Sequence, residues 1–329
     1  MQPKALISGA SGQDAKFLAE HLLSRGYDVH GIIRRQSVSE NQNSRVKHLE
    51  GVFKLHYGDV TDAYSLDRIF REVLPDRVFH TAAMSHVRVS FDVKEYTIQT
   101  NGIGTLNMLE VYRRVCPEAR FLTCCSSEQF GTAIDPDGYQ RETTPMWPTS
   151  PYGCSKVLAF NLTRHWRAAY KLFAATTICF NHSSPFRGAN FLTKKVVKEA
   201  VEIKLGKRHG MALGDLSPWR DFGHSSDYTR AMIMALDHTE PDDFVIATGV
   251  SHQIKDVVEY VFVKLGLDWE QYVTHDARLL RSQELPRLRG DASKARRILG
   301  WEPTYTFETL LDEMIASELA FQQERTETR

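Results

Sequence analysis

The sequence has no long apolar run and no excess of charge of either sign. No stretch of its 329 residues approaches the roughly 18 consecutive apolar residues that suggest a membrane span. Basic and acidic residues number 41 each, so the chain creates no overall field that would attract nucleic acid or a membrane surface. We therefore expect neither as a partner, and any anionic ligand must be held by a local cluster of cations.

Cysteine is also scarce. The five cysteines are an odd number without the spacing of metal ligands: Cys116, Cys124, Cys125, Cys154 and Cys179. The adjacent Cys124 and Cys125 could act as a redox switch, but cysteines at strand ends are more often small buried apolar residues. The chain enters its first strand directly after Met1-Gln2-Pro3-Lys4, so we expect no signal peptide, no metal site and a cytoplasmic location.

Apolar, β-branched runs alternate with helical patterns through the first half of the chain. Strands are expected at 5–7, 27–33, 53–56, 77–81, 121–125 and 174–180. Helices are expected at 14–24, 62–73, 95–115 and 152–171. Such alternation is typical of an α/β fold with a doubly wound parallel sheet.

The rhythm changes after residue 180. Segments that are rich in Ser, Pro, Gly and Asn, or that lack periodicity, are expected to be irregular at 181–190 and 210–224. The regular elements expected beyond residue 180 are helices at 193–205 and 227–238, a strand at 244–248 and two helical stretches toward the end. These segments predict a second, smaller lobe with pieces that return to the sheet.

A glycine-containing loop lies between the first expected strand and helix. It reads Gly9-Ala10-Ser11-Gly12-Gln13-Asp14-Ala15. A Gly-x-x-Gly pattern alone is often only a turn. Between a strand and a helix at the start of an alternating chain, it favours a nucleotide whose pyrophosphate accepts bonds from backbone N–H groups.

The end of the second expected strand distinguishes between two cofactors. NAD sites usually have an acidic residue there, which binds the ribose hydroxyl. This strand ends in Ile33-Arg34-Arg35-Gln36-Ser37, with Arg45 a little further on. Paired guanidinium groups and a hydroxyl suit a 2′-phosphate, although a solvated basic strand end is the alternative. The sequence therefore predicts NADP.

Three side chains could carry hydride chemistry. Tyr152 and Lys156 are four residues apart, on one face of the helix expected there. The ammonium is expected to lower the tyrosine pKa toward the working pH, so that the phenolate could take a hydroxyl proton while hydride leaves the same carbon. Tyr-x-x-x-Lys is common by chance, but Ser126, at the end of the preceding core strand, adds a hydroxyl for the same substrate oxygen.

Glu128 follows closely after Ser126. A carboxylate at the mouth of a sheet is costly unless it is solvated or has a task. A plain dehydrogenase needs only the hydroxyl, tyrosine and lysine. An added glutamate could remove a proton next to a newly formed ketone, whereas the alternative is a surface glutamate that caps the next turn.

Over nearly its whole length the chain resembles the GDP-mannose 4,6-dehydratases, a family of extended short-chain dehydrogenases/reductases. The segments that carry the resemblance are Ser11-Gly12-Gln13-Asp14, His30-Gly31-Ile32-Ile33-Arg34-Arg35, Leu55-His56-Tyr57-Gly58-Asp59, Ser85-His86-Val87, Ser126-Ser127-Glu128, Ser150-Pro151-Tyr152-Gly153, Phe180-Asn181-His182, Arg187-Gly188-Ala189-Asn190-Phe191, Arg220-Asp221-Phe222-Gly223-His224, Phe244-Val245-Ile246-Ala247-Thr248-Gly249, and Arg281 with Glu284. The later segments are typical of this family more than of the fold.

The resemblance implies a Rossmann-type sheet and a closed redox cycle on a GDP-sugar with NADP kept bound. Tyr152, Lys156 and Ser126 would serve oxidation at carbon 4, and Glu128 would remove the carbon 5 proton. Other residues implied at the cofactor are Gly9, Ser11, Gly12, Gln13, Asp14, Arg34, Arg35, Asp59, Val60, Ala82, Ala83, Ser85, Tyr96, His182 and Arg187. Those implied at the substrate are Ser85, Asn181, Asn190, Lys195, Arg220, Arg281 and Glu284.

The change of rhythm after residue 180 predicts the domain organisation, and the resemblance implies the assembly. The NADP-binding domain would be 1–180 with a returning piece near 223–250, and the interleaved nucleotide-sugar lobe would be 181–222 with 251–329. A homodimer or homotetramer is expected, with the segment from Arg35 to Arg45 near the cofactor of a neighbouring subunit.

Several positions depart from the family pattern and leave the sugar open. Ala15 stands for the third loop glycine and Ser126 for a threonine. Around the expected pocket, the departures are Met84 for glutamine, Thr149 for arginine, Ser183 for glutamate and Phe186 for a residue that is often arginine. Two other functions remain: a 4-reductase or epimerase of the same superfamily, and a non-catalytic NADP-binding scaffold.

Overall fold

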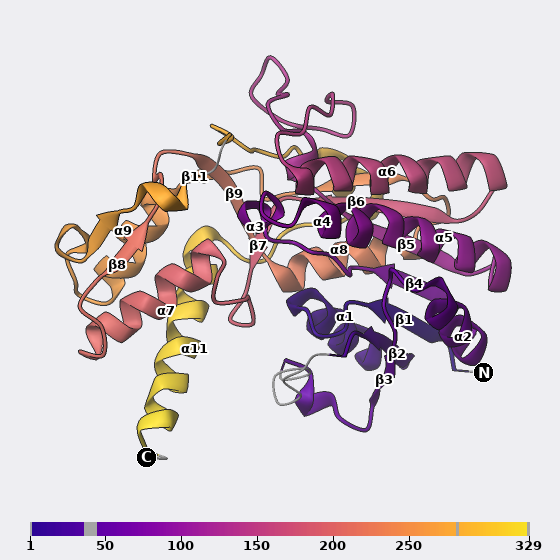
Figure 1. Cartoon of the computed structure of the whole chain (residues 1–329), viewed down its shortest axis with the longest axis horizontal. Coiled ribbons are helices and arrows are strands. Elements are labelled where there is room, and N and C mark those ends of the chain that lie inside the picture. The colour runs from indigo at the N-terminus through magenta and orange to yellow at the C-terminus, as the bar shows by residue number, and fades with distance from the viewer. Residues whose placement is uncertain (1, 36–44, 281–282, 328–329) are drawn as a thin grey trace.

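The computed structural model describes residues 2–35, 45–280 and 283–327, and its centre is a parallel sheet of seven strands (Figure 1). Their order is β10-β6-β5-β4-β1-β2-β3. The strands are β1 (Lys4–Ser8), β2 (Asp28–Ile33), β3 (Phe53–Tyr57), β4 (Arg77–His80), β5 (Arg120–Ser126), β6 (Ala174–Cys179) and β10 (Asp243–Ile246). Every pairing is parallel, which confirms the predicted doubly wound sheet.

Helices cover both faces of this sheet because its strands carry apolar side chains on both sides. In β1, Ala5 and Ile7 belong to one hydrophobic core and Leu6 to another. The first core includes residues of α1 (Gln13–Ser24), α8 (Ser225–Asp237) and α10 (Ser293–Leu299). The second includes residues of α2 (Ala63–Val73), α5 (Gly104–Val115) and α6 (Pro151–Tyr170).

The helix expected at 95–115 is present but has a wide turn within it. It consists of α4 (Lys94–Ile98), a π-helical turn (Gln99–Ile103) and α5. Gly102 lies in the π turn, where an added Cβ would come within 2.6 Å of the Leu158 side chain on α6. The glycine therefore lets these two helices approach closely.

A second lobe lies at the left of Figure 1 and has a hydrophobic core of its own. Its elements are β7 (Asn181–Ser183), α7 (Leu192–Lys204), β8 (Met211–Leu213), β9 (Trp219–His224), β11 (Ser251–Gln253), α9 (Ile254–Lys264), β12 (Val273–His275) and α11 (Phe307–Glu327). Val197, Val258 and Leu310 are fully buried where α7, α9 and α11 meet.

Two irregular segments expected in this lobe contain strands, so that part of the prediction was wrong. β7 begins the segment 181–190, and β8 and β9 lie in 210–224. Three-residue strands are too short to show a period. β9 was obscured by Arg220 and Asp221, which are buried because backbone and hydroxyl groups satisfy their polar atoms.

Residues near the end of the chain pack on the main sheet. Leu285, Leu288, Ala295 and Trp301 belong to the first core, and Trp301 Nε1 donates to the backbone oxygen of Asp227 on α8 at 2.8 Å. This stretch falls within the segment 251–329 that the sequence assigned to the second lobe. The lobe boundaries themselves stay a prediction. Within the described ranges, no helix is long and apolar enough to cross a membrane.

Candidate active site

The glycine loop lies at the point where the strand order reverses, between β1 and its neighbours β2 and β4. Gly9 has a φ of +75°, and an added Cβ would come within 2.8 Å of the Ala82 backbone after β4. Gly12 is the N-cap of α1 and has no side chain to cap it. The first N–H groups of α1 are thus left for an anion, which is what a pyrophosphate needs.

A cleft of about 630 Å³ runs from this loop between the two lobes. It brings together most of the residues predicted for cofactor and substrate. Those that line it are Gly9, Ser11, Gly12, Gln13, Asp14, Ala82, Ala83, Ser85, Ser126, Glu128, Tyr152, Lys156, Asn181, His182, Arg187, Asn190, Lys195 and Arg220.

A smaller hollow of about 150 Å³ adjoins it and shares Gly9, Ser11, Ala82 and Ala83. It is lined by four more of the predicted cofactor residues: Arg34, Asp59, Val60 and Tyr96. A guanidinium N–H of Arg34 hydrogen-bonds the Tyr96 hydroxyl, so the first arginine after β2 points across this hollow. Arg35 is exposed and lines neither space.

Tyr152 and Lys156 lie in the first turns of α6, close to the end of β5. Ser150 caps the helix by accepting from Gly153 N at 3.0 Å. Both side chains are buried, at 8% and 5% exposure, and Lys156 Nζ donates to the Cys124 backbone oxygen at 2.7 Å. The geometry holds the ammonium between the phenol and the end of β5.

The pKa of Tyr152 lies above its ordinary value, which differs from the sequence expectation. Burial raises this pKa, and it outweighs the lowering by the Lys156 charge and by the hydrogen bond with Ser126. Lys156 therefore lowers the pKa of Tyr152 as expected, but by less than burial of the phenol raises it. Ser126, Tyr152 and Lys156 nevertheless form one connected group.

Glu128 lies in a single 3-10 turn (Ser127–Gln129) directly after β5. Its backbone N–H donates to Ser126 Oγ at 3.3 Å, and the side chain is only 5% exposed while it lines the cleft. The alternative of a solvated surface glutamate is thereby excluded. Gly153 permits this arrangement, because a Cβ there would come within 2.7 Å of the Glu128 backbone oxygen.

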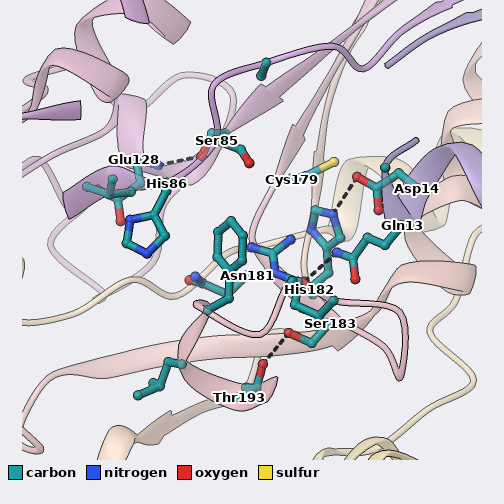
Figure 2. A pocket seen from close by; sticks show the side chains of 18 of the residues that line it. Gln13, Asp14, Ser85, His86, Glu128, Cys179, Asn181, His182, Ser183 and Thr193 are labelled. Carbon is teal, nitrogen blue, oxygen red and sulfur yellow. Dashed lines mark hydrogen bonds and ion pairs between the residues drawn. The ribbon is translucent and has the colours of Figure 1, made fainter. Parts of the chain in front are cut away.

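Two predicted cofactor residues, Asp14 and His182, form an ion pair (Figure 2). His182 Nε2 lies 3.2 Å from Asp14 Oδ2, and its Nδ1 lies 2.8 Å from the backbone oxygen of Phe180. Burial acts against the charge on Asp14, but His182 and the Ser225 hydroxyl lower the pKa of Asp14 to about 2. Burial likewise opposes charge on His182, and Asp14 still holds its pKa above the ordinary value.

Cations line the part of the cleft next to the second lobe. Arg220 on β9 is 3% exposed, donates to the backbone oxygen of Leu285 at 2.8 Å and lies 2.5 Å from Glu284 Oε1. Lys195 Nζ donates to the backbone oxygen of Ala212 at 2.6 Å. Glu284 thus contacts Arg220, which lines the cleft, but Glu284 itself does not line it. Arg281 lies outside the described residues.

Arg45 does not lie at the hollow that Arg34 lines, although its position shortly after the second strand suggested this. Its Nη1 donates to the backbone oxygen of Ser11 at 2.9 Å, and its Nε donates to that of Phe186 at 2.6 Å. These two hydrogen bonds therefore connect the glycine loop to the segment 184–191 on the other side of the cleft.

Sequence reasoning missed His86, which lines the cleft, and Asp221, which follows the cleft residue Arg220 on β9 but does not line the cleft itself. His86 caps α3 (Val87–Ser90), and its Nε2 lies 3.2 Å from the backbone oxygen of Asn190, so it links the lobes. Asp221 is fully buried and accepts bonds from Thr248 and Gly249, with burial raising its pKa to about 6. Both residues lie in segments that carried the resemblance, which was the signal available.

A dinucleotide groove at the switch point of a parallel sheet, with a tyrosine and a lysine on one helix face beside it, places the chain among the extended short-chain dehydrogenases/reductases. The fold is that of dTDP-glucose 4,6-dehydratase from Bacillus anthracis, solved with NAD, at a TM-score of 0.84, 22% identity and 98% coverage of both chains. It is also that of RMD from Pseudomonas aeruginosa, solved with NADPH, at a TM-score of 0.79 and 22% identity over 98% of this chain and 99% of the other.

The family follows from sequence similarity. A family model described as GDP-mannose 4,6 dehydratase matches residues 6–314. The protein of that name from Homo sapiens is 40% identical over 340 residues, which cover 96% of this chain and 91% of the human protein. The chain belongs to the GDP-mannose 4,6-dehydratase family.

Proposed function

We propose that the chain is an NADP-dependent 4,6-dehydratase of GDP-mannose or a closely related GDP-sugar. The observation that carries the proposal is the buried Glu128 in the same cleft as Ser126, Tyr152 and Lys156. A 4-reductase performs no elimination and needs no such base. A non-catalytic scaffold needs none of these four residues.

The groove fits a nicotinamide dinucleotide. Gly9 can be only a glycine, α1 begins without a side-chain cap, and the Nε of Arg187 is buried without a hydrogen-bond partner among the described residues. A pyrophosphate would satisfy both the helix N-terminus and this guanidinium. When bound, the cofactor would accept a hydride and later return it.

The chain's own residues would divide the proton transfers. Tyr152 would take the proton of the carbon 4 hydroxyl as hydride leaves that carbon, with Ser126 donating to the same oxygen and Lys156 stabilising the phenolate. Glu128 would then remove the carbon 5 proton, which is acidic beside the new ketone, and the carbon 6 hydroxyl would leave as water. Return of the hydride to carbon 6 and of a proton to carbon 5 would complete a redox-neutral cycle.

Three further parts of the proposal rest on particular side chains. NADP is favoured over NAD because Arg34 lines the adenine-side hollow where an acid would bind a ribose hydroxyl. A diphosphate is favoured near Arg220 and Lys195 because both cations line the cleft. A reducing compartment such as the cytoplasm is favoured because all five cysteines are free. Assembly into a homodimer or homotetramer rests on the family alone.

The function is tested by incubating the purified protein with GDP-mannose and catalytic NADP. A dehydratase forms a GDP-4-keto-6-deoxy sugar without net consumption of NADPH. A reductase or epimerase would leave the carbon 6 hydroxyl in place. Mass spectrometry of products from a panel of GDP-hexoses and GDP-heptoses would then identify the sugar, since loss of water lowers each product mass by the same amount.

A further inference from the structure

His86 follows β4 in the main lobe and contacts the segment of the second lobe that leads into α7. Its Nδ1 accepts a hydrogen bond from the Val89 backbone N–H at 3.3 Å, which caps α3. Its Nε2 lies 3.2 Å from the backbone oxygen of Asn190. Since a ring nitrogen that accepts a hydrogen bond carries no proton, the imidazole is the tautomer that donates from Nε2 to Asn190. One side chain thus bonds to both lobes.

A ring contact adds to this hydrogen bond. The centroid of the His86 ring lies 5.1 Å from that of Phe191, with 45° between the ring planes. The Phe191 ring also contacts the Arg187 guanidinium, whose carbon lies 3.8 Å from the ring centroid. An added Cβ at Gly188 would come within 3.2 Å of the same ring, so this segment is closely packed. His86 therefore contacts a packed segment that also includes a predicted cofactor residue.

Phe191 is also the residue at which α7 begins, so its position determines that of the cation on this helix. It is the N-cap of α7, and its backbone oxygen accepts from the Lys195 N–H at 2.8 Å. The Lys195 side chain lines the cleft together with Arg220 of β9. His86 lines the same cleft, and Figure 2 shows it in the same part of the pocket as Glu128. A movement of α7 away from His86 would therefore carry Lys195 away from the main lobe.

We propose that His86 is a positioning residue that holds the start of α7 against the main lobe and thereby sets the affinity for the diphosphate of the substrate. The inference rests on the proposed function, because the diphosphate is that of the GDP-sugar placed near Lys195 and Arg220. His86 takes part in no bond-making step. It raises the fraction of molecules in which the lobes are in contact, and a ligand that binds only these molecules has an apparent affinity proportional to that fraction.

The alternative is that His86 matters only as the N-cap of α3. A cap stabilises the helix that it begins, whereas the bond to Asn190 and the contact with Phe191 join two lobes. The two roles use different ring nitrogens, so two amide side chains can separate them. Asparagine places an amide oxygen near the position of Nδ1, and glutamine places an amide nitrogen near that of Nε2.

The experiment measures the binding of GDP to the full chain at saturating NADP by isothermal titration calorimetry. His86→Asn keeps the cap but loses the bond and the ring contact between the lobes, so GDP affinity should fall roughly ten-fold. His86→Gln keeps a donor for Asn190 and should bind GDP within about three-fold of wild type. The thermal unfolding midpoints should have the opposite order, with His86→Gln below His86→Asn, because only asparagine keeps the cap.

Kinetics with GDP-mannose give a second readout. His86→Asn should raise KM by about the factor seen for GDP and change kcat much less, since an interaction that acts equally on the ground state and the transition state changes KM alone. GDP affinity that is kept in His86→Asn and lost in His86→Gln would assign His86 to the cap and overturn the proposal, as would a fall in kcat at unchanged KM. Failure of the proposed function is a separate result, in which wild type binds GDP but forms no dehydrated product.

Discussion

His182 and Asp14 are 168 positions apart in the sequence and form an ion pair at 3.2 Å, which joins β7 to the first turn of α1. Asp14 also accepts from Ser225 Oγ at 2.5 Å, so one carboxylate links the glycine loop to two later segments. The sequence analysis assigned each of these residues to the cofactor site but did not predict that they contact each other. Both side chains line the cleft, and their ion pair also stabilises it by connecting two segments that are far apart in the sequence.

This pair predicts a loss of stability on the alkaline side. Asp14 has a lowered pKa, so its contribution is present above its ordinary value of 3.8 and is lost as pH falls through about 2. The pKa of His182 is raised, so its contribution is complete below its ordinary value of 6.5 and is lost as pH rises through the raised folded value.

The measurement is the thermal unfolding midpoint from about pH 6 to about pH 9. Wild type should lose stability with rising pH, and His182→Gln should start lower and change less. His48→Gln is the matched control, because His48 pairs with Glu20 on the surface and is half exposed. Parallel curves for wild type and His182→Gln would show that the pair does not stabilise the fold.

The preference for NADP should depend on Arg34 and not on its neighbour. Arg34→Ala removes a charged donor from the smaller hollow that also has Asp59 and Tyr96 in its lining, and a hydrogen bond to a charged group contributes about 1.5–3 kcal/mol. NADP affinity should therefore fall about ten- to a hundred-fold while NAD affinity changes little. Arg35→Ala is the control with the same loss of charge from an exposed position. Equal affinity of wild type for NAD and NADP would defeat the prediction.

Arg45 should control how long the cofactor stays bound. Its two hydrogen bonds close the glycine loop against the 184–191 loop, and each contributes about 1 kcal/mol. NADPH should leave Arg45→Ala roughly ten-fold faster or more, as seen by stopped-flow fluorescence. Arg45→Lys keeps the charge but cannot make both bonds at this geometry, so it should resemble alanine. Release from Arg45→Lys at the wild-type rate would assign the effect to charge alone.

Much of the sheet could be predicted because its strands and helices are long enough to show their periods. The β5 run ending at Ser126 and the helix that carries Tyr152 and Lys156 are examples. The three-residue strands β7 and β8 carry no period, so they were missed. Arg220 and Asp221 made β9 look irregular, because the partners that allow their burial come from distant segments.

The candidate site was predictable as a set of residues but not as a set of contacts. The motifs named Arg45, Asp14 and Tyr152, yet the partners of Arg45 and Asp14 are backbone or side-chain groups far along the chain. The raised pKa of Tyr152 depends on its burial, which the sequence does not show.

The central claim is that Glu128 is the base for elimination and that Tyr152 and Lys156 serve the hydride step. Glu128→Gln keeps the size of the side chain and its hydrogen bonding but removes the base. It should still oxidise the sugar and stop at the 4-keto hexose. Tyr152→Phe should block the first hydride transfer, so that no NADPH signal develops.

The most direct test is entry of solvent deuterium at carbon 5 of the GDP-sugar, followed by mass spectrometry or NMR, because it requires the base and does not depend on product release. A positioned general base contributes roughly a hundred- to ten-thousand-fold of rate, so Glu128→Gln should incorporate deuterium and form dehydrated product slower by about that factor. Incorporation and dehydration by Glu128→Gln at the wild-type rate would contradict the account, because Glu128 would then be a structural residue.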